Sequence, residues 1–226
     1  ERTVAIAPEA GSERLRRMVK KGYREEEILN SVDTLVENGV SQIKCYFLIG
    51  LPTETDEDVK EILFLARRIR HRILSGQKDG RKRWRLVLSV NPFIPKPATP
   101  FQWAPLEEVG ELKKKLKILQ KGIQHEKGME MIHDVPKWAY LQALLSRGDR
   151  RVGKILLASH RHQGNWRLAF QETDINPDFY VHRRRDFDEI FPWDFIDHGI
   201  PKERLREEYV KAMKEAGAGK SEGGMG

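Results

Sequence analysis

The sequence predicts an α/β protein in which part of a β/α barrel is followed by a mainly helical C-terminal extension. Strand-like and helical runs alternate from Thr3 to Val90, and the connections are long enough for parallel pairing. Each strand-like run has one apolar face and one face of small or polar groups, as expected where helices cover one side and a lined cavity the other. Three strands cannot close a barrel, so only part of one is predicted.

The strongest strand signal is the run Ile43–Ile49, which is almost entirely β-branched, aromatic or aliphatic. One of its faces is wholly apolar, whereas the other carries Lys44 and Tyr46. Gly50 ends the run, and Thr55 is placed to cap a helix whose first turn is acidic.

Periodicity and capping residues predict the other elements of the barrel part. We expect a strand at Thr3–Ala7, a helix at Glu13–Lys20, a helix ending at Asn38-Gly39, a helix with its apolar stripe from Val59 to Ile73, and a strand at Trp84–Val90. Polar groups lie at the C-terminal ends of the first and third of these strands, namely Glu9 and Asn91. In parallel β/α folds this is the edge where ligands bind.

The domain organisation follows from the same patterns. Residues 1–104 are the barrel part, 105–216 the helical extension and 217–226 a disordered tail. Within the extension we expect a long helix at Leu106–Lys127, two shorter helices between Pro136 and His160 broken near Gly148, and a last helix from Pro201 to about Ala216.

Composition excludes several classes of protein. The only cysteine, Cys45, lies on the apolar face of a strand, which excludes a disulfide framework and a cysteine-ligated metal or iron–sulfur centre built from this chain alone. No apolar run approaches membrane-spanning length and the start resembles no signal peptide, so we expect a cytoplasmic location without a membrane partner. The net charge of +7 permits a polyanionic partner such as RNA.

Several motifs resemble a known superfamily. The segments 9–15, 20–23 and 46–55 resemble the second half of a radical SAM barrel, in the branch that includes methylthiotransferases and coproporphyrinogen-oxidase-like enzymes. The segments 91–103, 146–151 and 191–197 look like an uncharacterised radical SAM family with an N-terminal cobalamin-binding domain.

The resemblance implies contacts to S-adenosylmethionine. Glu9 would bind the ribose and Lys21, where relatives usually have arginine, would meet the carboxylate. Backbone groups would approach the adenine after the second and third strands, and Tyr46 stands where relatives often have aspartate. The residues implied for the cofactor site are Glu9, Lys21, Tyr46, Gly50, Leu51, Asn91, Phe93 and Ile94.

The superfamily's Cys-x3-Cys-x2-Cys loop, which holds a 4Fe-4S cluster, is missing from this sequence. The resemblance therefore implies the C-terminal fragment of a radical SAM enzyme, with part of the substrate cavity but no catalytic or metal-binding residues of its own. Its expected partners are the upstream half of its barrel and a cobalamin-binding domain. We expect the fragment alone to be inert, with no cofactor bound to it; its substrate is not predicted.

An alternative of another class stays open, namely a basic RNA- or protein-binding module without catalysis. Basic clusters at 81–83, 150–151 and 183–185 could contact phosphates, while Trp84 and Trp166 could stack on bases. No recognition motif accompanies them.

Overall fold

The computed structural model describes residues 3–76 and 84–217, which divide into two compact units. The sheet unit contains the described residues of 1–93, 110–134 and 210–226, and the helical unit contains 94–109 and 135–209. The basic cluster 81–83 and, apart from Gly217, the expected disordered tail lie outside the described residues.

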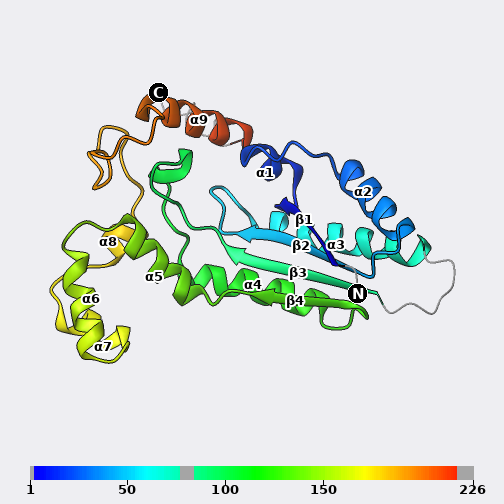
Figure 1. Ribbon diagram of the computed structural model, residues 1–226, viewed down its shortest axis with the longest axis horizontal. Coiled ribbons are helices and arrows are strands. Elements are labelled where there is room, and N and C mark those ends of the chain that lie inside the picture. The colour runs from blue at the N-terminus through cyan, green and yellow to red at the C-terminus, as the bar shows by residue number, and fades with distance from the viewer. Residues whose placement is uncertain (1–2, 77–83, 218–226) are drawn as a thin grey trace, which may run out of the picture. The chain divides into compact units, whose positions relative to one another are not determined.

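The sheet unit is built on a parallel sheet of four strands in the order β1-β2-β3-β4 (Figure 1). The strands are β1 (Thr3–Glu9), β2 (Gln42–Ile49), β3 (Arg85–Pro92) and β4 (Met129–His133). The three expected strands and their parallel pairing are confirmed, and β3 lies one or two residues further along than expected. The strand β4, which has five residues and pairs with β3, was not predicted from the sequence.

Four helices accompany the strands: α1 (Glu13–Met18), α2 (Glu25–Glu37), α3 (Asp56–Gly76) and α4 (Val109–Ile123). Gly39 has a φ of 75°, the left-handed conformation that commonly follows a helix end, and so closes α2 as expected. Thr55 caps α3, because its hydroxyl oxygen accepts the N–H of Asp58 at 3.3 Å. The helix α4 is shorter at both ends than the expected Leu106–Lys127, since the chain turns into β4 after Ile123.

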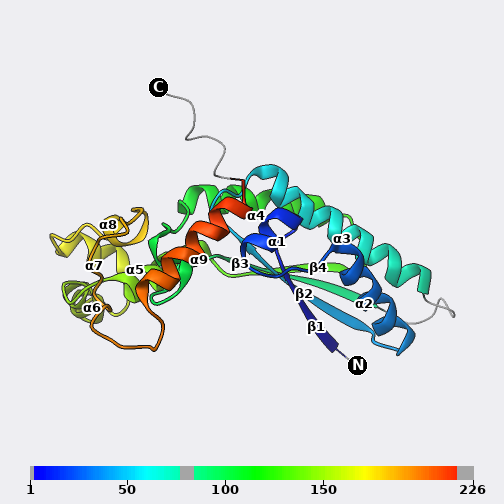
Figure 2. The ribbon, with the colours of Figure 1, turned by 90° about the horizontal axis from the view of Figure 1, so that it is seen from above.

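The core of the sheet unit lies between one face of the sheet and the apolar stripes of α2, α3 and α4. The apolar face of β2 is buried there, and Cys45 is 0% exposed. Figures 1 and 2 show α3 and α4 on the same side of the sheet. On the other face Tyr46 is 36% and Ile132 47% exposed. The predicted difference between the two faces of β2 is therefore confirmed, and the sheet is compatible with part of a β/α barrel.

The helical unit contains η1 (Pro100–Trp103), α5 (Pro136–Arg147), α6 (Val152–Arg161), α7 (Trp166–Glu172) and α8 (Asp178–Val181). A last helix, α9 (Lys202–Glu215), contributes residues to both units. The expected break between two helices near Gly148 is confirmed by the end of α5 and the start of α6. A second apolar cluster, which includes Leu106, Leu144 and Val181, forms the core of this unit.

Among the described residues, no helix has both the length and the apolar character needed to span a membrane.

Candidate functional site

The carboxyl ends of β1, β2 and β3 meet at one edge of the sheet. Glu9 pairs in register with Phe47, and Asn91 pairs with Leu48. The N–H of Phe93 donates to the carbonyl of Ile49 at 2.8 Å, so Phe93 lies beside the backbone that leads into Gly50. Parallel sheets bind ligands at this edge, because here the loops diverge and leave backbone groups free.

Glu9 occupies an unusual position at the end of β1. The register shifts between Ile6 and Glu9, which marks a bulge, and Glu9 has a φ of 67°. A left-handed conformation costs a residue with a side chain on the order of 1–2 kcal/mol. Bulges of this kind re-aim a side chain at the end of a strand, and strained conformations concentrate at functional sites. The backbone conformation of Glu9 is therefore unusual for a residue with a side chain, an observation independent of any sequence motif.

Glu9 and Lys21 lie side by side, with 3.4 Å between Oε1 and Nζ. Lys21 is positioned by the end of α1, where Lys20 has a φ of 58° and the N–H of Lys21 reaches back to the carbonyl of Arg16 at 2.8 Å. Both partners are half-buried. Two of the eight predicted site residues, taken from separate segments of the chain, are therefore in contact.

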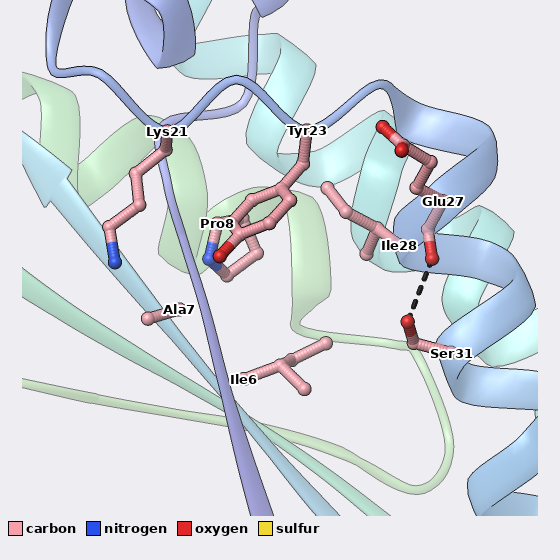
Figure 3. Close-up of a pocket in the computed structure, with 8 residues that line it drawn as sticks. All are labelled: Ile6, Ala7, Pro8, Lys21, Tyr23, Glu27, Ile28 and Ser31. Atoms are coloured by element: carbon pink, nitrogen blue, oxygen red, sulfur yellow. Dashed lines mark hydrogen bonds between the residues drawn. The ribbon is translucent and has the colours of Figure 1, made fainter.

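A pocket of about 440 Å³ opens between β1 and α2 beside this pair (Figure 3). Its lining is mixed, with Lys21, Tyr23, Glu27 and Ser31 as its polar contributors. The full lining is Ile6, Ala7, Pro8, Lys21, Tyr23, Glu27, Ile28 and Ser31. Of the predicted site residues only Lys21 is among them, so this pocket and the strand ends are two separate features.

The loop after β2 is held in shape by a buried carboxylate. Gly50 has a φ of 79°, and its N–H donates to Oε2 of Glu54 at 2.7 Å. The same oxygen lies 3.0 Å from Nζ of Lys115, and the two side chains are 1% and 5% exposed. Since the N–H of Gly50 is already engaged, any backbone contact that Gly50 makes to a ligand would have to use its carbonyl. Leu51 is buried at 3% exposure.

Asp58 joins the loops after β1 and β2. Its carboxylate accepts the Ser12 hydroxyl at 2.6 Å, the Thr55 N–H at 2.9 Å and the guanidinium of Arg14. Burial would raise the pKa of Asp58, but the hydrogen bonds from Arg14, Ser12 and Thr55 outweigh it and hold the pKa below its ordinary value.

Gly11 allows the loop after β1 to lie against α3. A Cβ atom at this position would stand 2.2 Å from the backbone nitrogen of Ile62. Only glycine permits an approach this close.

Tyr46, Asn91 and Ile94 lie in three different surroundings. Tyr46 lies on the open face of β2, opposite Ser89 of β3. The centroid of its ring is 4.8 Å from the ammonium nitrogen of Lys44. Asn91 is half-buried at the end of β3. Ile94 belongs to the helical unit, where it packs against the apolar cluster around Leu106. The strand ends of the sheet unit therefore account for Glu9, Gly50, Asn91 and Phe93.

This chain does not supply ligands for an iron–sulfur cluster. Cys45 is its one cysteine, and burial in the core raises the pKa of the thiol to about 12. A cluster of the radical SAM kind needs three thiolates, which this sequence cannot provide. Within residues 3–76 and 84–217, no three His, Cys, Asp or Glu side chains are grouped as a metal site requires.

Four side chains that hold the loops after β1 and β2 were not recognised from the sequence: Arg14, Glu54, Asp58 and Lys115. Asp58 lies in the acidic first turn of α3, and Glu54 lies just before the helix. In the sequence these acidic residues indicated only a favourable interaction with the helix dipole. Thr55 followed by Asp58 three residues later is, however, the spacing of a capping box, and this signal could have pointed to Asp58. Nothing in the sequence pairs Glu54 with Lys115, 61 residues away.

Comparison with known proteins points to one superfamily. The sequence model of the radical SAM superfamily matches residues 1–66, which include β1, β2 and the start of α3. An uncharacterised protein of Methanocaldococcus jannaschii is 40% identical over 156 residues, which are 69% of this chain and 32% of the relative. The chain therefore spans about a third of that relative's length. No solved structure gives a significant match.

Proposed function

We propose that this chain supplies the S-adenosylmethionine-binding side of a radical SAM barrel. The observation that carries the proposal is the placement of Glu9, which lies in a left-handed bulge at a carboxyl strand end, in contact with Lys21 and inside the matched span. In this reading Glu9 accepts hydrogen bonds from the ribose hydroxyls and Lys21 faces the carboxylate of the cofactor.

The residues present suit these parts of the cofactor. The Glu9 carboxylate is 24% exposed and lies at the edge where parallel sheets in general bind ligands. Gly50, which is buried, has a φ of 79° that other residues rarely adopt, and Asn91 lies at the end of the neighbouring strand. Adenine recognition would come from the backbone of Gly50 and Leu51, with Phe93 contributing after the third strand. Tyr46 would line the cavity.

The cluster, by contrast, has no place among the residues of this chain. S-adenosylmethionine and a 4Fe-4S cluster together supply the one-electron chemistry of radical SAM proteins. In the proposal the cluster comes from an upstream half of the barrel, which is also the structural partner of the β1 edge. Cobalamin in a further upstream domain, the uncharacterised cobalamin-binding family and the methylthiotransferase branch belong to the same proposal.

The test is a ligand-observed NMR titration of this protein with millimolar S-adenosylmethionine and 5′-deoxyadenosine, which detects weak binding by part of a site. We expect both ligands to bind only at millimolar concentration, too weakly for the isolated chain to retain a cofactor, and Glu9→Ala to weaken this binding by about 1–3 kcal/mol, the effect of deleting hydrogen bonds to a charged group. Glu37→Ala, which removes an exposed carboxylate at the end of α2, is the matched control.

Equal affinities of the two variants would exclude Glu9 from the site. If the wild-type protein binds neither ligand, this chain does not carry the adenosine contacts. The alternative of a basic RNA- or protein-binding module is favoured by a different observation, which concerns the helical unit.

A further inference from the structure

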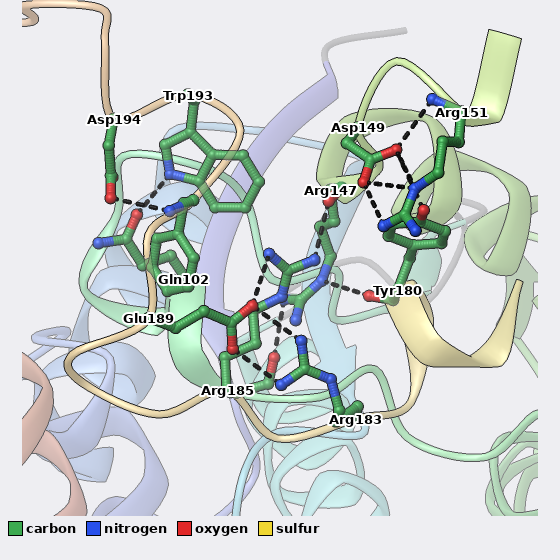
Figure 4. Close-up of polar contacts among 12 residues, drawn as sticks. Gln102, Arg147, Asp149, Arg151, Tyr180, Arg183, Arg185, Glu189, Trp193 and Asp194 are labelled. Atoms are coloured by element: carbon green, nitrogen blue, oxygen red, sulfur yellow. Dashed lines mark hydrogen bonds and ion pairs between the residues drawn. The ribbon is translucent and has the colours of Figure 1, made fainter.

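Arginine side chains are concentrated in one part of the helical unit. Figure 4 shows Arg147, Arg151, Arg183 and Arg185 around the α5–α6 turn and the segment that follows α8. Arg150 directly precedes Arg151 in the same turn. We call these five residues the arginine cluster: Arg147, Arg150, Arg151, Arg183 and Arg185. Among the described residues, two carboxylates form ion pairs with it, those of Asp149 and Glu189.

Arg147 is the most enclosed member. Its side chain is 0% exposed, and it donates to the carbonyls of Ala104 at 2.7 Å and Tyr180 at 3.1 Å. Its Nη2 has no hydrogen-bond partner among the described residues. Carbonyl groups satisfy donors but do not neutralise a charge. Burial and the nearby guanidinium groups of Arg185 and Arg183 accordingly lower the pKa of Arg147 to about 9.

Arg185 adds a second buried charge beside it. Its Nη2 donates to the carbonyl of Arg147 at 2.8 Å, and its guanidinium lies 5.3 and 5.1 Å from the ring centroids of Phe191 and Trp193. Glu189 is shared, but Arg183 binds it through two hydrogen bonds of 2.8 Å, whereas Arg185 stands 3.8 Å away. The single charge of Glu189 therefore leaves Arg147 and Arg185 largely uncompensated.

A pocket of about 500 Å³ lies against this cluster, lined by Asp149, Arg150, Arg151 and Pro192. One wall is the turn that directly follows Arg147. The other is Pro192, which stands between the two rings that pack on Arg185. One wall is therefore next to Arg147 and the other next to Arg185, the two arginines whose charges are largely uncompensated.

Arg150 and Arg151, the two arginines that line the pocket, differ in their ion pairing. Arg151 is held by Asp149, whose carboxylate accepts its backbone N–H at 2.9 Å and its side-chain Nε at 3.0 Å. The Tyr180 hydroxyl also donates to Asp149 at 3.1 Å. Asp149 thus orients Arg151 instead of presenting a free negative charge. Arg150 is exposed and pairs with no carboxylate among the described residues.

We propose that this pocket binds a phosphate group, carried either by a small phosphate compound or by a nucleic-acid backbone. Guanidinium groups offer two parallel N–H donors that match phosphate oxygens, and such charge-assisted bonds are among the strongest in proteins. Arg150 and Arg151 would contact the phosphate directly, while Arg147 and Arg185 would make the surrounding field positive. This site is independent of the adenosine site proposed above.

The test is a calorimetric titration of the whole chain with pyrophosphate and, separately, with a short single-stranded RNA. Arg150→Gln removes the unpaired charge at the exposed wall and is expected to lower the affinity about tenfold, as one charge-assisted hydrogen bond would. Arg167→Gln removes an exposed charge on α7 outside the pocket lining and is the matched control. Circular dichroism checks that both variants are folded.

Binding of pyrophosphate that depends on Arg150 supports the proposal with a small ligand as the source. Binding of RNA alone, with the same dependence and an affinity that falls with salt, supports it with the nucleic-acid backbone as the source. Binding of neither ligand, or equal losses in the Arg150 and Arg167 variants, would overturn it. None of these outcomes involves Glu9, so the two proposals fail separately.

Discussion

Glu54 and Lys115 form a buried ion pair, with 3.0 Å between Oε2 and Nζ, that fixes the loop after β2. The same oxygen of Glu54 accepts the N–H of Gly50. This one oxygen of Glu54 therefore connects the loop to Gly50, at the end of β2, and to Lys115 of α4. Because Gly50 lies at the candidate adenosine site, the shape of that edge depends on a lysine in a distant part of the sequence.

Lys115→Met is expected to destabilise the protein strongly, since it removes the ammonium group that lies against the buried Glu54 carboxylate. Breaking a buried pair in this way costs about 3–5 kcal/mol. Chemical denaturation measures the loss. Lys114→Met, at an exposed neighbour on the same helix, should change stability by less than about 0.5 kcal/mol. The double variant Glu54→Gln with Lys115→Met should recover part of the loss, and equal losses in the two lysine variants would refute the pair's importance.

Gly11→Ala is expected to destabilise the protein by about 1–3 kcal/mol, the usual effect of overpacking. The new methyl group would stand 2.2 Å from a backbone nitrogen of α3, which cannot move aside as a flexible side chain would. Gly153→Ala is the control, because a Cβ there meets nothing within 4 Å and the position lies within α6. It should stabilise by a few tenths of a kcal/mol. Melting temperatures of the two variants should shift in opposite directions.

The sequence predicted those parts of the fold that depend on periodicity. The run Ile43–Ile49 has one wholly apolar face and one face with polar groups. Both the strand and its buried face could therefore be assigned. Met129–His133 was missed because it is short, follows a turn and carries charge on its exposed face. Arg16 shows a different limit, since it lies in a basic run typical of a solvated face, yet its side chain is 1% exposed and donates to the carbonyl of Ala10.

Asp58→Asn is expected to lower stability at neutral pH, with a deficit that shrinks in acid. The pKa of Asp58 is lower in the folded protein than its ordinary value. Its carboxylate therefore contributes stability above the unfolded pKa near 4, and this contribution is lost as the pH falls through the folded pKa. Urea denaturation of both proteins from pH 7 down to about pH 3 measures the difference. The exposed Asp56→Asn is the control, and a difference that does not depend on pH would contradict the assignment.

The predictability of the site follows the same physics. Glu9, Gly50 and Asn91 could be placed at one edge because parallel strands end together. The left-handed conformation of Glu9 could not be foreseen, since a bulge depends on how β1 pairs with β2. Buried charges such as Glu54 and Arg147 were also missed, because their burial depends on partners that lie far apart in the sequence.

The chain by itself is expected to produce no 5′-deoxyadenosine from S-adenosylmethionine. Reductive cleavage needs a low-potential cluster, and a single buried cysteine cannot hold one. The measurement is iron–sulfur reconstitution followed by a dithionite assay, with a no-protein sample as the control. Turnover above that control would show that this chain holds a working cluster after all.

Glu9→Gly and Glu9→Ala are expected to separate backbone strain from ligand binding. Both variants lose the carboxylate and its ion pair with Lys21, which is half-exposed and contributes at most about 1 kcal/mol. They differ in the backbone, because glycine adopts a φ of 67° freely and alanine does not. Glu9→Gly should therefore be more stable than Glu9→Ala by about 1 kcal/mol. Denaturation measures this difference, and a difference near zero would mean that the bulge relaxes in the variants.

Ligand-observed NMR supplies the second half of the comparison. Both variants should bind 5′-deoxyadenosine more weakly than the wild type and to the same extent, because the carboxylate and not the backbone is expected to hold the ribose. A protein that is stabilised by glycine at position 9 yet loses its ligand would show that the strain at Glu9 serves binding, since folding alone would favour glycine there. Retained binding in Glu9→Gly would instead assign the ribose contact to the backbone of the bulge.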